Sequence, residues 1–597
     1  MKQTLISLPN KIAPYRFKKV IFDIETESLE GNVIHCIVAK VIGGDTYLFP
    51  PDKLQEGANL IASADVLIGH NIIGFDIPIL NKHFDLDLTN HVEDTLVVSR
   101  LVNPVLTGGH SLENWGYLLY PNDVEKRKAK QPDSWENYTE EMGQYCIQDV
   151  ELNADVYYEL LKKSEEFSQE SIDLEHAVAK IMKEQELTGF MLDEQKATML
   201  SARLNSKMVE IEKKVHETFK PKWVDDKLVS PKLKKDGTLS KVGLSNEEMS
   251  KCLRTSNFKP FMRQKWTEFN LASRKQIGEY LIDFGWKPNK FTPTGQPIVD
   301  ETTLEKVKDI PEAALIAEFM MLQKRVAQVS SWLELSKDSR VHGFVIPNGA
   351  ITGRMTHRNP NVAQTPSINK PYGKECRECW TVPEGYKLVG IDASSLELRV
   401  LAHYMKNKEY INEIVNGDIH STNQTLAGLG SRSQSKTFIF ALIYGAGDAK
   451  IGSVVGGNAK AGAALRTRFI RNLPALGNLT SSVERAAQTR QHLKALDGRL
   501  IHIRKVYSSL NTLLQGGGAI IMKTALVLFY NRIKELELNA KFVANIHDEW
   551  QLEVIEEQAE QVGQLGVEAI QETARVLNLN CPLDGEYKIG DSWYDTH

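Results

Sequence analysis

The sequence predicts a multidomain fold of the α/β and α+β class, and three observations carry this prediction. The chain has 597 residues, which corresponds to roughly four units of about 150 residues each. Strand-like and helix-like segments alternate over residues 1–165 and again after Lys337, with a strongly helical region between them. Its 42% hydrophobic and 25% charged residues are those of an ordinary globular protein, which excludes a disordered or fibrous chain.

The composition also predicts the surroundings of the protein. Six cysteines are too few for a disulfide framework, so we expect a reducing, cytoplasmic setting. We find no stretch that resembles a membrane span of about 20 apolar residues, and we expect no membrane partner. The net charge of −5 argues against binding a polyanion through bulk charge alone.

The first 165 residues carry the alternating pattern clearly. An apolar run at residues 20–22 leads into Asp23, and further strands are expected over residues 33–41 and 66–69. Helices are expected over residues 77–84 and 140–161. This order indicates one α/β domain.

The rest of the chain predicts several further parts. Residues 172–217 are strongly helical, whereas Pro221, Pro231 and Gly237 make a long regular element unlikely in the lysine-rich stretch 220–241. Helices are expected again near residues 272–284 and 312–335. After Lys337, strands ending in acids are expected at residues 388–392 and 542–548, with helices over 433–444 and 517–534.

A first set of acids follows the strands and one helix of the first domain. Asp23 and Glu25 leave the same face of a strand, and Asp76 follows another strand and a glycine turn. Tyr145 and Asp149 share one helix face. Taken singly, such acids are usually solvated, but four converging carboxylates repel each other unless cations such as Mg²⁺ or Mn²⁺ neutralise them. Two ions would activate water to cleave a phosphodiester, with Tyr145 orienting that water.

The order of these motifs resembles the proofreading 3′–5′ exonucleases of the DEDD superfamily, tyrosine subtype. The resemblance covers residues 18–162 and includes the segment 110–115. It implies a ribonuclease H-like 3′–5′ exonuclease domain that acts on the 3′ end of single-stranded DNA.

A second set combines two acids with a helix. Asp392 and Asp548 end strands, and between them Arg432, Lys436, Phe440 and Tyr444 recur every four residues along one slowly turning helix face. Two cations followed by two aromatic rings suit a nucleotide better than a core, because the cations can bind a triphosphate and the rings can pack on base and sugar.

These segments resemble family A DNA polymerases, the DNA polymerase I family. Residues 392–399 resemble motif A, residues 432–445 motif B and residues 547–549 motif C. The amino-acid sequences of several other segments are more similar to those of the replicative polymerases of T-seven-like phages. These segments are 348–354, 416–420, 436–439 and 510–515. The resemblance implies a right-hand polymerase domain with thumb, palm and fingers.

The resemblance also implies roles for individual residues. Asp392 and Asp548 would hold two Mg²⁺ ions (Mn²⁺ is possible), Ala393 would add its carbonyl, and Glu549 belongs to the same catalytic set. The phosphate ligands would be Lys436, which would assist the departure of pyrophosphate, together with Arg432 and His420.

Further residues would select the nucleotide and hold DNA. Glu397 resembles the sugar gate that leaves no room for a 2′-hydroxyl. Phe440 stands where the phage relatives usually have tyrosine, so we expect strong discrimination against dideoxynucleotides. Arg354 and Gln515 would contact the new base pair from the minor groove, where every correct pair presents acceptors, and His547 would bind DNA.

The expected domains are an exonuclease domain at 1–165 and a polymerase domain at 166–597. The latter comprises a thumb at about 172–335 with a basic insertion at 220–268, a palm at about 336–425 and 500–597, and fingers at about 426–499. The expected partners are primer-template DNA, dNTPs and a replisome helicase or primase. The insertion is either a basic loop that touches duplex phosphates or a site for a processivity factor such as host thioredoxin.

Three alternatives remain open at this point. The chain could be a bacterial or organellar repair polymerase of the same family rather than a phage enzyme acting in the host cytoplasm. A single-subunit RNA polymerase shares the palm carboxylates, but Glu397 and the exonuclease motifs argue against it. A nuclease whose polymerase half only clamps DNA is the third.

Overall fold

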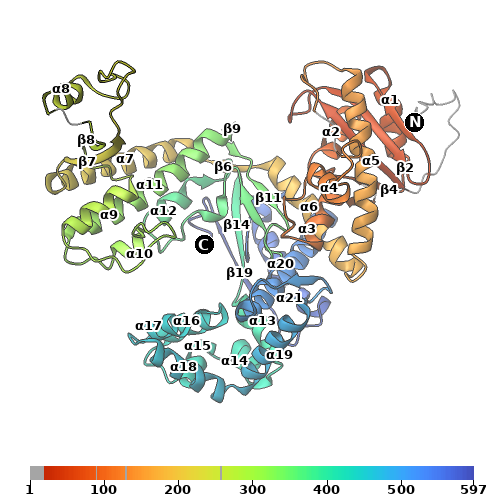
Figure 1. Cartoon of the computed structure of the whole chain (residues 1–597). Coiled ribbons are helices and arrows are strands. Elements are labelled where there is room, and N and C mark those ends of the chain that lie inside the picture. The colour runs from red at the N-terminus through yellow and green to blue at the C-terminus, as the bar shows by residue number, and fades with distance from the viewer. Residues whose placement is uncertain (1–18, 89–90, 128–130, 256–257) are drawn as a thin grey trace. The chain divides into compact units, whose positions relative to one another are not determined.

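The computed structural model describes residues 19–88, 91–127, 131–255 and 258–597. The chain divides into two compact units, one of residues 1–192 with 335–597 and the other of residues 193–334. Figure 1 shows the elements of both units, coloured along the chain.

The first unit begins with a five-stranded sheet in the order β3-β2-β1-β4-β5. Three of its strands pair antiparallel: β1 (Lys19–Thr26), β2 (Ile34–Val41) and β3 (Thr46–Phe49). The other two, β4 (Val66–Gly69) and β5 (His91–Asp94), continue the sheet from β1 in parallel. Phe22 and Ile21 of β1 lie in two different cores, so the strand is buried on both faces. This is why it reads as a continuous apolar run before Asp23.

Five helices accompany this sheet, and the expected helices after residues 77 and 140 are confirmed. They are α1 (Leu54–Ala62), α2 (Asp76–Phe84), α3 (Thr95–Val102), α4 (Leu112–Leu119) and α5 (Glu140–Lys163). The side chains of Asp94, Ser111 and Thr139 accept backbone N–H groups at the starts of α3, α4 and α5. These caps explain where the three helices begin.

The expected helical run over residues 172–217 is wrong in one respect, because the structure interrupts it. Helix α6 (Gln169–Thr188) ends at Gly189, whose φ of 67° is readily adopted by glycine. Strand β6 (Phe190–Leu192) follows and joins a small sheet in the order β13-β6-β10-β9. The other strands of that sheet are β9 (Ser336–Lys337), β10 (Arg340–Val341) and β13 (Trp380–Thr381).

A four-stranded antiparallel sheet in the order β17-β18-β14-β19 forms the centre of the second half of this unit. Its strands are β14 (Tyr386–Ala393), β17 (Ala540–Ile546), β18 (Glu549–Ile555) and β19 (Gly585–Gly590). Helices α20 (Ser509–Glu535) and α21 (Ala559–Val576) supply core residues against it. The ring of Phe529 on α20 stacks on Trp550 of β18 at 5.6 Å.

Helix α20 corrects the expectation that no stretch resembles a membrane span. Residues Val506–Glu535 are long and apolar enough to cross a membrane, and 72% of that apolar window is buried inside the structure. Ile521 and Phe529 of this helix are core residues of the first unit. The apolar length of α20 therefore follows from burial on nearly all sides.

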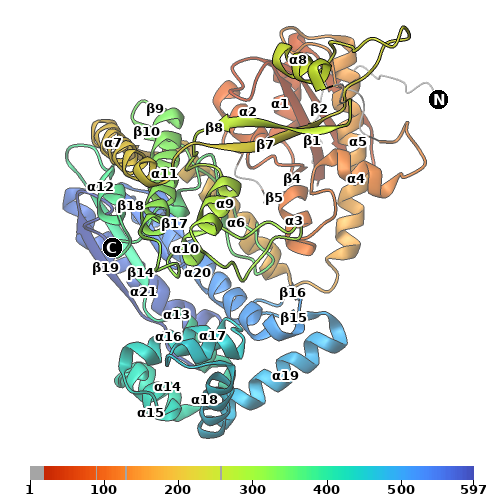
Figure 2. The same ribbon diagram turned by 60° about the vertical axis from the view of Figure 1, so that its left-hand side comes forward.

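Several smaller elements complete the first unit. The strands are β11 (Phe344–Ile346), β12 (Thr356–Arg358), β15 (His492–Lys494) and β16 (Leu500–His502). The helices are α12 (Gly373–Glu378), α13 (Leu396–Met405), α14 (Lys408–Asn416), α15 (Ile419–Ala427), α16 (Arg432–Ile443), α17 (Asp448–Ser453), α18 (Ala459–Asn472) and α19 (Pro474–Arg490). Both views show α14 to α18 gathered at one end of this unit (Figures 1 and 2).

In the second unit, the described residues form five helices and a two-stranded ribbon. The helices are α7 (Glu194–Thr218), α8 (Asn246–Thr255), α9 (Arg274–Asp283), α10 (Glu301–Leu304) and α11 (Pro311–Leu335). Strands β7 (Lys222–Val229) and β8 (Phe261–Thr267) pair antiparallel, and Figure 2 shows α8 beyond the far end of this ribbon. The expectation that residues 220–241 lack a long regular element is therefore wrong, since β7 occupies eight of them. The finer domain boundaries stay predictions.

Candidate active sites

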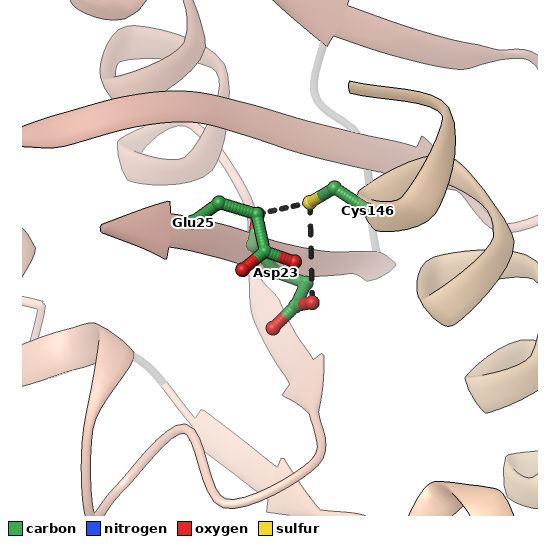
Figure 3. Close-up of side chains that lie close together, drawn as sticks. All are labelled: Asp23, Glu25 and Cys146. Carbon is green, nitrogen blue, oxygen red and sulfur yellow. Dashed lines mark hydrogen bonds between the residues drawn. The ribbon is translucent and has the colours of Figure 1, made fainter. Parts of the chain in front are cut away.

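The first candidate site lies where β1 meets α5. Asp23 and Glu25 are two residues apart on β1, and Glu25 is buried. The thiol Sγ of Cys146 on α5 lies 3.6 Å from the backbone oxygen of Asp23 and 3.9 Å from its carboxylate Oδ2 (Figure 3). One potential ligand atom from each of these three residues falls within 4.8 Å of the others. The strand and the helix therefore bring the expected acids together with a thiol.

Asp76 joins this site from the start of α2. Its carboxylate Oδ1 accepts the backbone N–H of Ile24, the residue between Asp23 and Glu25, at 3.1 Å. Burial, followed by the negative charge of Asp23, raises the pKa of Asp76 well above its usual range. Buried carboxylates that repel each other in this way are a donor set that suits a hard divalent cation.

Tyr145 and Asp149 lie on α5 one turn apart, on either side of Cys146 in the chain, and both are buried. The ring of Tyr145 meets that of Trp135 edge to face at 5.9 Å. Their helix contacts Asp23 through Cys146, which places them beside the same strand. Their roles as water-orienting and metal-binding residues stay predictions.

Sequence reasoning missed two residues of this site, Cys146 and Asp94. Cys146 falls three residues before Asp149, a spacing that puts both on one helix face, so the motif itself held that signal. Asp94 has no comparable local signal. Its carboxylate accepts the N–H groups of Asn71 and Ile73 across the sheet edge, in the loop that leads to Asp76.

The second candidate site lies at the end of β14 and the turn between β17 and β18. Asp392 pairs with Glu549 across β14 and β18, and the N–H of Ala393 donates to the backbone oxygen of Asp548 at 3.0 Å. His547, with a φ of 57°, turns the hairpin so that Asp548 follows at its tip. The sheet therefore places Asp392 and Asp548 side by side.

Burial and mutual repulsion dominate the electrostatics of this pair. Burial, followed by the negative charges of Asp548 and Glu549, raises the pKa of Asp392 to about 8. Burial, followed by the negative charge of Glu397, raises the pKa of Asp548 to about 6. Two acids that resist ionisation side by side fit a divalent ion, which would supply the neutralising charge.

Glu549 points into a different environment from that of the two aspartates. Its carboxylate accepts the indole N–H of Trp593 at 2.6 Å and the amide N–H of Gln551 at 2.7 Å. His597 and Arg377 lie 3.1 Å and 3.8 Å away. Burial alone would raise the pKa of Glu549, but hydrogen bonds and charge from His597, together with Arg377, lower it. Its predicted catalytic role stays a prediction, and these four contacts were not foreseen.

Glu397 lies between Tyr444, predicted to bind the nucleotide, and Arg354, predicted to contact the DNA minor groove. Its Oε1 accepts the hydroxyl of Tyr444 at 3.1 Å and lies 3.4 Å from a guanidinium nitrogen of Arg354. Burial, followed by the charge of Glu397, raises the pKa of Tyr444 to about 12. Tyr444 stands one residue beyond the end of α16, rather than within the helix as expected. Its ring still stacks on that of Phe440, 6.1 Å away.

The cations of α16 occupy its first turns. Arg432 makes a double hydrogen bond to the carboxylate of Asp418, at 2.7 Å and 3.1 Å. The His420 ring lies 6.5 Å from Phe440, and its pKa is lowered by burial and then by the charges of Arg432 and Lys436. Helix α16 therefore carries Arg432, Lys436 and Phe440 at the predicted four-residue spacing, and His420 of α15 lies beside them. Gln515 lies on α20.

Comparisons with known proteins agree with this geometry. Residues 240–595 match the family model described as DNA polymerase family A, and residues 8–165 match the model described as 3′-5′ exonuclease. The chain is 32% identical to the DNA-directed DNA polymerases of Escherichia phage T7 and Enterobacteria phage T3, over 97% of this chain and 100% of each relative. It is 24% identical to DNA polymerase I of Pseudomonas aeruginosa, over 92% of this chain and 57% of the relative.

A solved structure shares the fold. The polymerase domain of Pol1 from M. smegmatis, solved with DNA primer-template and dNTP, superposes with a TM-score of 0.77. At 18% identity it covers 97% of this chain and 96% of that chain.

Proposed function

This chain belongs to DNA polymerase family A and carries a 3′–5′ exonuclease domain. We propose that Asp392 and Asp548 are the catalytic acids of primer extension. We propose likewise that the exonuclease removes mispaired 3′ ends through the acids Asp23, Glu25, Asp76 and Asp149. The chain is a phage-type DNA-directed DNA polymerase over its full length, as its match to the T7 and T3 enzymes shows. The observation that carries the assignment of residues is the meeting of Asp392, Asp548 and Glu397, with the pKa values of both aspartates raised.

Domains of these two families use divalent metal ions, and we propose two Mg²⁺ or Mn²⁺ ions at each site. Asp392, Asp548 and the carbonyl of Ala393 would hold them in the polymerase, and Asp23, Glu25, Asp76 and Asp149 in the exonuclease. Such ions, when bound, lower the pKa of a primer 3′-hydroxyl or of a water molecule and neutralise the phosphate charge.

The side chains around Asp392 and Asp548 would select and orient the nucleotide. Lys436 and Arg432 of α16 and His420 of α15 would donate to the triphosphate, while Phe440 and Tyr444 pack on the sugar and base. Glu397 is already fixed by Tyr444 and Arg354, so its carboxylate would close the space that a 2′-hydroxyl needs. Arg354, Gln515 and His547 would contact the primer-template DNA.

The experiment that tests this assignment is primer extension with deoxynucleotides and ribonucleotides. We expect the native chain to prefer deoxynucleotides, and Glu397→Ala to raise relative ribonucleotide use by about tenfold or more, because the blocking carboxylate is gone. Glu413→Ala is the matched control, since Glu413 lies on α14 and bonds to Thr422. Equal use of both nucleotides by the native chain would favour an RNA polymerase instead.

For the partners, we propose primer-template DNA, dNTPs, a single-stranded 3′ end and a protein that binds the β7–β8 ribbon. One face of the ribbon carries two exposed apolar pairs, Trp223 with Trp266 and Leu228 with Met262, opposite each other in the strand register. The Trp rings lie 5.5 Å apart. A thioredoxin-like processivity factor suits this ribbon face, because apolar pairs offer nothing to phosphates, while the surrounding lysines can contact duplex DNA.

Product length on a long template, at limiting enzyme, tests the protein partner. We expect thioredoxin to lengthen the products of the native chain and to have no effect on a Trp223→Ala/Trp266→Ala variant. Leu29→Ala, at an exposed apolar residue of the first unit, is the control. Unchanged lengths with the native chain would reject thioredoxin as the partner.

We also propose that the enzyme replicates phage DNA in the host cytoplasm beside a helicase and primase. The full-length similarity to the T7 and T3 enzymes supports a phage enzyme over a bacterial or organellar repair polymerase.

A further inference from the structure

Two adjacent residues of α6, Glu175 and His176, are both buried and contact different parts of the first unit. The Nε2 of His176 accepts the backbone N–H of Asp94 at 2.7 Å, and its Nδ1–H donates to the carbonyl of Ile172 at 2.8 Å. The accepting Nε2 makes the ring the neutral Nδ1–H tautomer. Burial lowers the pKa of His176, in keeping with a neutral ring.

Asp94 carries the contact from His176 into the exonuclease site. Its buried carboxylate accepts the N–H groups of Asn71 at 2.9 Å and Ile73 at 3.1 Å. The same loop ends at Asp76, whose carboxylate accepts the N–H of Ile24 on β1. A path of hydrogen bonds joined by short stretches of chain therefore runs from α6 to the strand that bears Asp23 and Glu25.

Glu175 makes the corresponding contact with the palm. Its Oε1 accepts from Lys523 of α20 at 2.6 Å and from Arg499, which lies between β15 and β16. All three side chains are buried. Gly353, the residue before Arg354, lies close to Arg499: a side-chain Cβ at this glycine would be 3.4 Å from the guanidinium of Arg499. The cluster therefore reaches the neighbourhood of the predicted minor-groove contact.

The β15–β16 hairpin holds the exonuclease a second time. His502 of β16 contacts the carbonyl of Val102, the last residue of α3, at 3.0 Å. Because Asp94 caps the start of α3, this helix is tied at one end to His176 and at the other to His502. Both contacts involve neighbours of the Glu175–Arg499 ion pair: His176 follows Glu175 in the chain, and His502 lies in the same hairpin as Arg499.

A pocket borders one side of the loop. A cavity of about 690 Å³ opens there, lined by Ile73 and His176 together with Val527 and Tyr530 of α20. Ile72 and Ile73 of the loop are buried in the core beside the sheet, so packing and hydrogen bonds together hold the loop.

We propose that Asp94 and His176 are positioning residues of the exonuclease, and that Glu175 connects them to the palm, so that the Asn71–Asp76 loop is held by both domains. This inference rests on the proposed role of Asp76 in the exonuclease. Through this connection, a structural change around Lys523 and Arg499 alters the position of the Asn71–Asp76 loop in the exonuclease site.

The test compares His176→Leu, which removes both ring nitrogens, with His176→Gln, which keeps an acceptor. Glu184→Gln is the matched control, because Glu184 lies on the same helix and pairs with Lys534 of the same α20 at the surface. Three quantities are measured on each full-length variant. They are the exonuclease rate on single-stranded DNA, the primer-extension rate, and the hydrogen-exchange rate of the backbone amides in residues 71–76.

We expect His176→Leu to lower the exonuclease rate and to speed exchange at Asn71 and Ile73, each by about tenfold, with primer extension within about twofold. His176→Gln should restore most of both. Glu175→Gln should speed the same exchange, although Glu175 bonds to Lys523 and Arg499 rather than to the loop, whereas Glu184→Gln should not. If His176→Leu fails to fold, Asp94→Asn should give the same local pattern.

Two results would overturn the proposal. One is a folded His176→Leu or Asp94→Asn chain with native exchange and exonuclease rates, and the other is exchange that rises uniformly over the whole exonuclease domain. Asp76→Ala separates this from the proposed function, because native exonuclease activity in that variant would reject the role of Asp76 itself.

Discussion

At the scale of single residues, Arg432, the proposed phosphate ligand, is already paired with a carboxylate. Its guanidinium faces the carboxylate of Asp418 with the paired geometry that it would offer to a phosphate group. This contact lowers the pKa of Asp418, which keeps the competing carboxylate ionised. As the proposed phosphate ligand, Arg432 would have to exchange Asp418 for the nucleotide.

Asp418→Asn should weaken that competition. The amide keeps an oxygen for the N–H of His420 at the start of α15, so the helix cap survives. We expect the KM for dNTP to fall by about two- to fivefold with kcat unchanged, the range of an exposed ion pair. Asp448→Asn, which breaks a similar contact with Arg466 on a neighbouring helix, is the control. A KM equal to that of the native chain would show that Asp418 does not compete.

At the scale of elements, the turn between α3 and α4 contains a histidine, His110, whose pKa differs between the folded and the unfolded chain. His110 lies 2.8 Å from the hydroxyl of Ser99, to which Trp115 of α4 also donates. Burial, followed by the charge of Arg100, lowers the pKa of His110 to about 4. The folded chain therefore keeps this ring neutral at pH values where the unfolded chain protonates it.

The sign of the pH dependence follows from this difference. The unfolded chain has the ordinary pKa of about 6.5, so the stability due to neutral His110 is fully present above that pH and is lost as pH falls toward about 4. We expect His110→Asn to reduce the drop in thermal unfolding midpoint between about pH 7 and pH 4.5. The same drop in both chains would mean that other groups cause it.

At the scale of the whole molecule, the sequence predicted the strands that carry the proposed catalytic acids, because β1 and β14 contain buried apolar runs. It did not predict the β7–β8 ribbon, since Trp223 and Leu228 are exposed and their partners stand more than thirty residues away. The break at Gly189 was hidden for a similar reason, because the short strand after it is set by distant strands.

The candidate sites divide in the same way. Residues in motifs, such as Asp392 and Lys436, could be found because their spacing along a strand or helix is itself the signal. The contacts of Glu549 with Trp593 and Arg377, and of Asp418 with Arg432, join residues that no local pattern relates. These contacts come from packing, which the sequence alone does not reveal.

The central claim is that one chain carries two separate active sites, and paired activity measurements on Asp548→Ala and Asp23→Ala test it most directly. We expect Asp548→Ala to lose primer extension by about a thousandfold while it still degrades single-stranded DNA from the 3′ end. Asp23→Ala should show the reverse. Extension that survives in Asp548→Ala, or that disappears in Asp23→Ala, would contradict the claim.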